Sequence, residues 1–451
     1  METFHGFDFQ PIEIDRHGAL KSGADELAAH VKSKGVTDVV LICHGFRNDE
    51  NDARALYTRF LQTFAGNRAH ASLKAALTGR TFAFGGVFWP SMIFPEPDDS
   101  GGVALSTADA PAADRARLES MKAGLDAPAA KKIDDLLALI GKAPDDSNAR
   151  REMVSVLLDL VRDLPVADAN EMHGALANVT PDELCTALMA DTVTVAAPSG
   201  GGGATGIPTL GGGLASPGGG QAQGLFGKVF GFVPKFLNLT TFLLMFHRCG
   251  TVGEKGISLA VRKVKAAASP RIHLVGHSLG GRAVTACAKA LLDAPPIQVD
   301  TMMLLEAAYS HFGLSPAATG ASLVQHPRGH FRDVIEKKAV KGPILATHSE
   351  RDKVVAQAYT AMAAISLNNA KAIGDEKSPF GGIGRNGVLD AVEAERLDLN
   401  DAGVAYTFAA DKKVHNLNGS RKVNGVSIID SHGDVTSPAI TWAFASLVAS
   451  V

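Results

Sequence analysis

Residues 271–284, RIHLVGHSLGGRAV, decide the fold. The run opens with four apolar residues at 272–275, which is typical of a short buried strand. The pentapeptide GHSLG follows at 276–280, and an apolar helical pattern continues from 283 to 292. The stretch therefore predicts a strand, a sharp turn that carries Ser278, and a helix, with small residues on either side of the serine that let strand and helix approach.

A serine on such a turn is a candidate nucleophile. The five-residue pattern is weak evidence by itself, because a chain with 47 glycines contains it by chance roughly 0.3 times. The alternative is a glycine-rich turn with an ordinary serine. The interpretation therefore depends on whether a base and an acid follow in the chain, since a serine hydroxyl needs both to become reactive.

Two carboxylates compete for the role of the acid. In nucleophile-elbow enzymes the acid and then the histidine follow the serine, each after a strand. Asp352 follows the apolar run PILAT and precedes a helical pattern, where the alternative is a helix N-cap. Glu306 ends the preceding apolar run and is the alternative acid, because a buried carboxylate needs a partner. Asp352 is the preferred candidate.

The best candidate for the base is His432, in IIDSHGDV, at the end of an apolar run and before the last helix. Asp430 and Asp434 beside it are expected to have structural roles. His277 is adjacent to Ser278 and is expected to point away from it. The other histidines near strand ends fit the required chain order less well, and these are His44, His348 and His415.

An oxyanion hole requires two backbone N–H groups near the serine. One is expected from Leu279, directly after the nucleophile, and the other from Phe46 in the loop His44-Gly45-Phe46 after the early strand. The alternative is an ordinary strand-to-helix turn. Arg47 beside this loop either meets an acidic substrate group or is simply an exposed arginine at a helix start.

Composition limits the classes of function. The 451 residues are 46% hydrophobic, and a net charge of −3 provides no global basic surface, so we expect no nucleic-acid partner. The four cysteines are scattered without metal-like spacing, and GGIG at 381–384 is not a convincing dinucleotide motif, so we expect neither metal nor cofactor. The first residues lack the features of a secretory signal, which favours a cytoplasmic protein.

Strand and helix patterns alternate along two parts of the chain, residues 1–94 and 251–451, and this predicts an α/β fold whose mostly parallel sheet has helices on both faces. Helices are expected at 24–34, 51–77, 252–268, 328–338, 354–366 and 438–449. Strands are expected within 4–14, at 37–43, 81–89, 272–275, 299–305 and 343–347, at 406–410 or 414–417, and at 426–429.

Residues 95–250 form a long insertion in this pattern. Amphipathic helical patterns occupy its first part, between 114 and 163, and a further helix is expected near 181–190. A glycine-rich segment at 199–224 is expected to be a disordered loop. The apolar segment 225–247 contains Lys228, Pro234 and Lys235 and is too short to span a bilayer. It either packs over the core or an oligomer interface, or serves as a lid over an acyl-binding cleft with peripheral contact to lipid.

The motifs HGF at 44–46, GHSLGG at 276–281, HSERD at 348–352 and SHGD at 431–434 resemble the α/β-hydrolase superfamily, and within it bacterial serine hydrolases of the lipase and esterase type. The resemblance covers residues 37–89 and 251–451 and omits the insertion, which is lid-like. It implies an α/β-hydrolase fold, Ser278, Asp352 and His432 as catalytic triad, and Phe46 and Leu279 as oxyanion donors.

We therefore expect a cofactor-independent serine hydrolase that forms an acyl-enzyme with carboxylic esters or lipids. Thioesterase or amidase activity would use the same triad. A non-catalytic binding protein with this fold is the alternative from another class.

Overall fold

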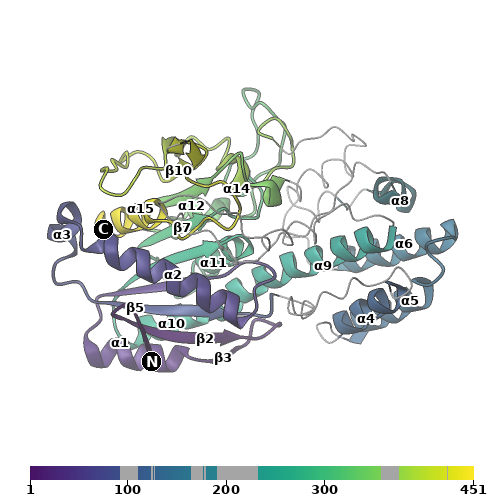
Figure 1. Cartoon of the computed structure of the whole chain (residues 1–451), viewed down its shortest axis with the longest axis horizontal. Coiled ribbons are helices and arrows are strands. Elements are labelled where there is room, and N and C mark those ends of the chain that lie inside the picture. Colours follow the sequence, from purple (N-terminus) through teal and green to yellow (C-terminus); the bar gives the residue numbers. More distant parts are fainter. Residues whose placement is uncertain are drawn as a thin grey trace, which may run out of the picture.

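The computed structural model describes residues 1–91, 110–122, 125, 127–163, 176, 179–189, 232–356, 375–423 and 425–451. In these residues a ten-stranded sheet has the order β1-β2-β5-β4-β6-β7-β8-β10-β9, with β3 paired to β2 (Figure 1). The strands are β1 (Glu2–Phe4), β2 (Phe7–Ile14), β3 (Leu20–Ser22), β4 (Asp38–Cys43), β5 (Phe82–Phe88), β6 (Arg271–His277), β7 (Thr301–Leu305), β8 (Ile344–His348), β9 (Ala394–Asp398) and β10 (Val414–Asn418). The predicted α/β class with a mostly parallel sheet is confirmed.

Only β1 and β3 run antiparallel to β2, and all other neighbours in this sheet are parallel. Strand β4 lies between β5 and β6, and the chain continues from β4 to β5 and from β6 to β7. The connections that follow β4 and β6 therefore lead to opposite sides of this strand pair. A crevice at the carboxyl ends of such strands is the usual place for a ligand in parallel sheets.

Helices cover both faces of the sheet, as the sequence predicted. The residues of β4 alternate between two apolar clusters: Val39 and Leu41 face one cluster, and Val40 and Ile42 face the other. The first cluster includes α1 (Ala24–Lys34), α10 (Ser258–Ala267) and α11 (Leu279–Ala290), and the second includes α2 (Glu50–Arg68) and α15 (Pro438–Ala449). A strand buried on both faces needs a continuous apolar run, which residues 39–43 supply.

The apolar segment of the insertion forms α9 (Phe232–Thr251), which extends away from the sheet in Figure 1. It packs against α11 and against helices of the insertion. The described helices of the insertion are α4 (Ala110–Lys122), α5 (Ala127–Leu139), α6 (Ser147–Asp163) and α8 (Pro181–Met189), and α9 packs against α4, α6 and α8. Nearly all described side chains of α9 are buried, so packing over the core, one of the two expectations for 225–247, is what the described part shows. No described helix is both long and apolar enough to cross a membrane.

No break separates α9 from the core that follows it. The chain continues through the π-helix Val252–Ile257 directly into α10. The expected boundary between 250 and 251 thus falls inside one continuous helical run, which leads from the insertion into the helix layer that contains α10 and α11.

Several expected elements have different bounds in the structure. The expected helix 51–77 is interrupted near His70, which caps a separate helix α3 (Ala71–Leu77). The expected helix 328–338 shrinks to α12 (Arg332–Glu336), and the last expected strand to β12 (Val426–Ser427), paired with β11 (Lys422–Val423). Strand β9 was not predicted. The glycine-rich segment 199–224 and most of the expected helix 354–366 lie outside the described residues.

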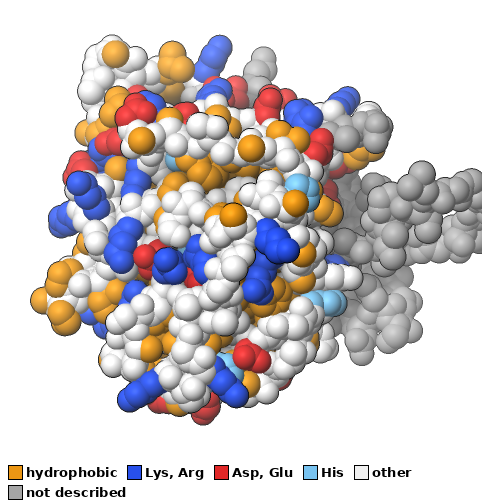
Figure 2. Space-filling view, turned by 90° about the vertical axis from the view of Figure 1, so that its left-hand side faces the viewer, with side chains coloured by type: hydrophobic (Ala, Val, Ile, Leu, Met, Phe, Trp, Pro, Cys, Tyr) orange, Lys and Arg blue, Asp and Glu red, His pale blue; other side chains and the backbone are white. Residues whose placement is uncertain are grey.

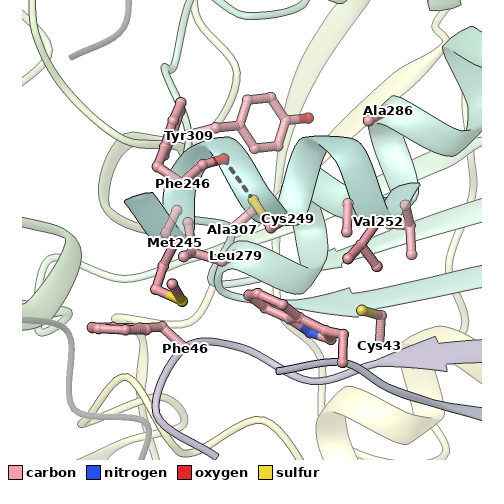
Figure 3. Packing of buried hydrophobic residues seen from close by; sticks show 14 of the residues in the cluster. Cys43, Phe46, Met245, Phe246, Cys249, Val252, Leu279, Ala286, Ala307 and Tyr309 are labelled. Atoms are coloured by element: carbon pink, nitrogen blue, oxygen red, sulfur yellow. Dashed lines mark hydrogen bonds between the residues drawn. The ribbon is translucent and has the colours of Figure 1, made fainter. Parts of the chain in front are cut away.

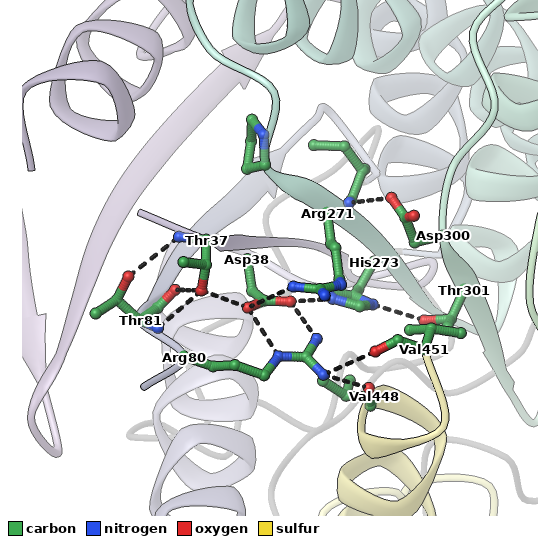
Figure 4. A network of polar contacts seen from close by, with 12 residues as sticks. Thr37, Asp38, Arg80, Thr81, Arg271, His273, Asp300, Thr301, Val448 and Val451 are labelled. Carbon is green, nitrogen blue, oxygen red and sulfur yellow. Dashed lines mark hydrogen bonds and ion pairs between the residues drawn. The ribbon is translucent and has the colours of Figure 1, made fainter. Parts of the chain in front are cut away.

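A buried polar network joins the amino ends of the strands to the end of α15 (Figure 4). Asp38, fully buried at the start of β4, pairs with Arg80 and accepts a hydrogen bond from His273 at 3.0 Å. Arg80 also donates to the carbonyl oxygens of Val448 and Val451, at 2.8 and 3.0 Å. Because an unpaired buried charge is costly, this network fixes α15 to the sheet.

Figure 2 views the side on which α1 and α3 lie in Figure 1. Lys and Arg side chains gather across the middle of this face, with a few acidic side chains among them. The candidate site described next forms at the carboxyl ends of the strands, away from this basic band.

Candidate active site

Ser278 lies on the turn between β6 and α11 and has φ 57° and ψ −124°. A non-glycine residue in this region of φ is strained, at a cost of about 1–3 kcal/mol. The turn is held by the Ser278 N–H, which donates to the Leu305 carbonyl at 3.0 Å, and by the Ser278 carbonyl, which accepts from Ala308 at 3.1 Å. The predicted strand, turn and helix are confirmed, and the serine is held in a defined, strained orientation.

Two glycines let this turn exist. A methyl group at Gly276 would lie 2.3 Å from the Gly280 carbonyl oxygen, and one at Gly280 would lie 2.2 Å from the Cys43 carbonyl oxygen. Both distances are far below van der Waals contact, so no other residue fits at either position. The GHSLG pattern is thus explained by the close approach of β6, α11 and the end of β4.

His432 and Asp352, which are 80 positions apart in the chain, meet at the carboxyl ends of the strands. His432 Nδ1 donates to Asp352 Oδ2 at 2.8 Å, and both side chains are buried. Asp352 Oδ1 also accepts the Val355 N–H at 2.9 Å. One carboxylate therefore contacts the histidine with one oxygen and caps a helix with the other, so the helix-cap interpretation is confirmed and the role of Asp352 as an acid stays a prediction.

The loop that carries His432 is fixed by its neighbours. Asp434 accepts hydrogen bonds from the N–H groups of Asp430, at 3.1 Å, and Ser431, at 2.8 Å. This agrees with the structural role expected for Asp434.

His277 ties this loop to the elbow. His277 Nε2 donates to the His432 carbonyl oxygen at 3.0 Å, and the two imidazole rings are 4.8 Å apart. Burial lowers the pKa of His277 to about 3, so the ring stays neutral at physiological pH. His277 therefore contacts the backbone of the candidate base, which was not foreseen.

The structure leaves one link of the expected triad open. Ser278 Oγ and His432 Nε2 are both buried, and neither has a hydrogen-bond partner among the described residues. The Ser278 hydroxyl is thus held beside the loop of His432 through His277, without a direct hydrogen bond to the imidazole. Such bonds are often long in enzymes without substrate and tighten in the complex.

The loop after β4 packs directly on the serine. A methyl group at Gly45 would lie 2.6 Å from Ser278 Cβ, so the backbone at Gly45 approaches Ser278 as closely as a glycine allows. Within the described ranges no acceptor is found for the backbone N–H groups of Phe46 and Leu279. An oxyanion hole requires unpaired backbone N–H groups of this kind near the nucleophile.

Apolar packing holds the predicted oxyanion loop, residues 44–46 after β4, against the insertion (Figure 3). The ring of Phe46 meets that of Phe242 on α9 edge-on, at 6.2 Å, and Phe46, Leu279 and Met245 lie together in the same buried cluster. The Arg47 guanidinium lies 5.5 Å from the centre of the Phe46 ring.

The remaining histidine candidates have other partners or other places. His44 Nδ1 donates to the Gly45 carbonyl at 2.9 Å, its ring stacks on Trp89, and burial lowers its pKa to about 4. His415 contacts the Glu395 carboxylate. Burial lowers the pKa of His348 to about 4. Of the described histidines, only His432 contacts the candidate acid Asp352.

Glu306, the alternative acid, is also buried near this site. It follows β7 with φ 44°, and burial together with the charge of Asp352 raises its pKa well above the usual range. Neither of its carboxylate oxygens has a hydrogen-bond partner among the described residues. The hydrogen bond from His432 therefore goes to Asp352 and not to Glu306.

Two features of the site were not predicted. The segment around Gly384, dismissed as a dinucleotide motif, supports the acid, since a methyl group at Gly384 would lie 2.9 Å from Asp352 Oδ2. A pocket of about 240 Å³ opens beside the oxyanion loop. It is lined by Pro11, Glu13, Ile14, His44, Asn48, Asp49, Glu50, Phe88, Trp89 and Pro90. Glycines with a purely steric role and pockets between distant strands leave no signal in a single sequence.

The described residues contain no group of three or more His, Cys, Asp or Glu side chains that could hold a metal ion. All four cysteines are free thiols.

No family model matches the chain, no similar curated protein is found, and no solved structure matches it.

Proposed function

We propose that this protein is a serine hydrolase with an α/β-hydrolase fold, which cleaves carboxylic esters or lipids through an acyl-enzyme. The observation that carries the proposal is the contact of His432 Nδ1 with Asp352 Oδ2 at 2.8 Å, on a loop tied to the strained Ser278 turn by His277 at 3.0 Å. Nucleophile, base and acid come from different loops at one edge of the sheet, in the chain order of elbow enzymes.

In the first step Ser278 Oγ attacks the carbonyl carbon of the ester while His432 Nε2 takes the hydroxyl proton. Asp352 accepts from Nδ1 and stabilises the imidazolium that forms. The N–H groups of Phe46 and Leu279 bind the oxyanion. The tetrahedral intermediate then breaks the bond to the alcohol, which leaves with the proton from His432, and the acyl group stays on Ser278.

In the second step water replaces the alcohol. His432 removes one proton from the water as its oxygen attacks the acyl carbon, and the same proton returns to Ser278 Oγ as that bond breaks. The products are the carboxylic acid and the free serine, so no cofactor or oxidant is consumed.

The substrate class is proposed from the apolar surroundings of the oxyanion loop. Phe46 packs against Phe242 of α9, and neighbouring side chains of this helix are buried in the same cluster. An apolar wall at the site favours an acyl chain over a charged acid. Thioesters and amides are the alternative substrates, because they use the same machinery. In this proposal the insertion is a cap, and contact with lipid through 225–247 requires α9 to leave the helices that bury it.

A non-catalytic binding protein with this fold is the second candidate. The observation that favours it is that Ser278 Oγ and His432 Nε2 make no hydrogen bond in the structure. A binding protein has no need for the Ser278–His432 link, whereas a hydrolase must form it during the reaction.

Hydrolysis of a series of nitrophenyl esters distinguishes the two candidates. We expect turnover by the wild type that increases from acetyl to medium-length acyl chains, and none above background by Ser278→Ala. A folded wild-type protein that hydrolyses none of these esters, and none of the thioesters and anilides with the same acyl chains, contradicts the hydrolase proposal. A preference for acetyl esters contradicts only the acyl-chain assignment.

A further inference from the structure

Glu306 is a fully buried carboxyl group for which the proposed triad has no use. Neither carboxylate oxygen has a hydrogen-bond partner of good geometry among the described residues. The nearby Thr347 oxygen accepts the Glu306 backbone N–H at 3.0 Å, and its hydroxyl makes no hydrogen bond to the Glu306 carboxylate. A carboxylate that is buried without donors is strongly unfavourable when ionised, so Glu306 is expected to keep its proton.

The groups that face Glu306 strengthen this expectation. Two acidic groups raise its pKa further: Asp352 from the loop after β8 and Asp434 from the loop before α15. Arg385, which follows Gly384 on α14 (Ile383–Asn386), donates to the Glu350 carbonyl at 2.7 Å. The imidazole of His432 donates its hydrogen bond to the Asp352 carboxylate and not to Glu306. A second negative charge would therefore meet repulsion, which burial makes stronger.

Glu306 and Asp352 approach each other at Gly384. A methyl group at Gly384 would lie 2.6 Å from the Glu306 carbonyl carbon and 2.9 Å from Asp352 Oδ2. The Gly384 backbone is fixed between them, since its N–H donates to the Ala307 carbonyl and its carbonyl accepts from Ser349, both at 2.9 Å. Glu306 is thus a fully buried acidic neighbour of Asp352.

Asp352 needs donors because it is fully buried and must stay ionised. It receives the Val355 N–H on one oxygen and His432 Nδ1 on the other. We propose that Glu306 is a neutral carboxylic acid whose O–H donates to the Asp352 carboxylate, and that it acts as a positioning residue that keeps Asp352 ionised and aimed at His432. The catalytic part of this proposal rests on the proposed function, whereas the protonation of Glu306 does not. Glu306 keeps its proton throughout the reaction.

Infrared difference spectroscopy tests the protonation without any substrate. The wild-type spectrum minus that of Glu306→Gln at pH 7 should show the carbonyl stretch of a protonated carboxylic acid, which shifts in D₂O. The matched control is Glu350→Gln, the same change at an exposed position on the neighbouring loop, and it should not remove this band. Absence of the band in the wild-type difference spectrum overturns the proposal.

The pH profile of kcat/KM tests the positioning role. Glu306→Gln keeps a neutral donor, so we expect a rate within about threefold of wild type and an unchanged acid limb. Glu306→Leu loses the donor, and we expect kcat to fall about tenfold to a hundredfold with little change in KM, because a hydrogen bond to a charged group is lost. The acid limb should move to higher pH, because the Asp352 carboxylate without the hydrogen bond from Glu306 stabilises the imidazolium of His432 more strongly.

An ionised Glu306 predicts a different pattern. Removal of its charge in Glu306→Gln would then move the acid limb to lower pH, and this result overturns the proposal. Circular dichroism tests whether Glu306→Leu is folded. If that variant does not fold, the pH profile of Glu306→Gln and the infrared band still test whether Glu306 is neutral. If the wild type hydrolyses no ester, the proposed function fails, while the infrared band still establishes or refutes the neutral Glu306.

Discussion

Acidification from pH 7.5 to 5.0 should destabilise this protein strongly, because it holds several histidines in neutral form. Burial lowers the pKa of His44 and His348 to about 4 and that of His277 and His311 to about 3. In the unfolded chain these side chains titrate near 6.5. Below that pH the unfolded state binds more protons than the folded state, so the free energy of unfolding falls as the pH falls.

The magnitude follows from the size of these shifts. A histidine whose pKa drops from 6.5 to about 4 loses about 2 kcal/mol of stabilisation between pH 7.5 and 5.0, and the four together lose about 8 kcal/mol. Glu306 acts in the opposite sense, because its raised pKa stabilises the fold at low pH and loses that effect as the pH rises. On acidification from pH 7.5 to 5.0, Glu306 therefore raises the free energy of unfolding by at most about 3 kcal/mol. These five groups alone give a net loss of about 5 kcal/mol, which is comparable to the whole stability of many proteins, and burial also lowers the pKa of His247 to about 4.

Urea unfolding at a series of pH values measures this effect. Trp89 and Trp442 are both buried, and the fluorescence of these two tryptophans should report the loss of the fold. We expect the free energy of unfolding to decrease continuously towards pH 5, and His311→Asn to show a decrease about 2 kcal/mol smaller. A stability that is constant or increases on acidification over this range would refute the neutral buried histidines.

Three substitutions test the site and the sheet. Gly45→Ala brings a methyl group within 2.6 Å of Ser278 Cβ and should displace the oxyanion loop, so we expect kcat on a nitrophenyl ester to fall by about a hundredfold. Asp352→Asn removes the negative charge beside His432 and offers an amide donor that favours its wrong tautomer, and initial rates should show kcat lower by about 10³ to 10⁴. Arg80→Met leaves Asp38 buried without its cation, and urea unfolding at pH 7.5 should show a loss of about 3–5 kcal/mol.

Each substitution has a matched control. A methyl group at Gly66, inside α2, meets open space, so Gly66→Ala should keep full activity. Asp430→Asn changes an exposed carboxylate beside His432 and should keep kcat within a few-fold. Arg271 is 43% exposed and lies 4.0 Å from Asp38, so Arg271→Met should cost about 1 kcal/mol or less. Equal effects in a variant and its control would contradict the role assigned to that residue.

The elements that the sequence predicts well are those with a strong local signal. Strand β4 is buried on both faces and reads as a continuous apolar run. Helix α1 ends at Gly35 with φ 63°, and α2 begins at Asp49 with a capping box. In each case the residues that form the element also determine where it ends, so no tertiary information is needed.

Other elements depend on partners far away in the chain. Strand β9 has the sequence AERLD, which lacks an apolar alternation, and it forms by pairing with β10 at the edge of the sheet. The apolar character of α9 indicated that it is buried, but nothing in its own sequence indicates which helices pack against it. Tertiary packing decides both cases.

The candidate site shows the same division. The contact between His432 and Asp352 was predicted from chain order. The third link, between Ser278 and His432, was predicted as well, and the structure does not form it. Glu306 was recognised only as a rival acid, because its neighbour at Gly384 is 78 positions away. A sequence can suggest which residues react, whereas the groups that set their charge come from the fold.

The most direct test of the central claim is covalent labelling with a fluorophosphonate, followed by mass spectrometry of the full chain and its peptides. The account predicts one adduct, located on Ser278, that is absent in Ser278→Ala and much slower to form in His432→Ala. A folded wild-type protein that forms no adduct, or an adduct that persists in Ser278→Ala, would contradict Ser278 as an activated nucleophile.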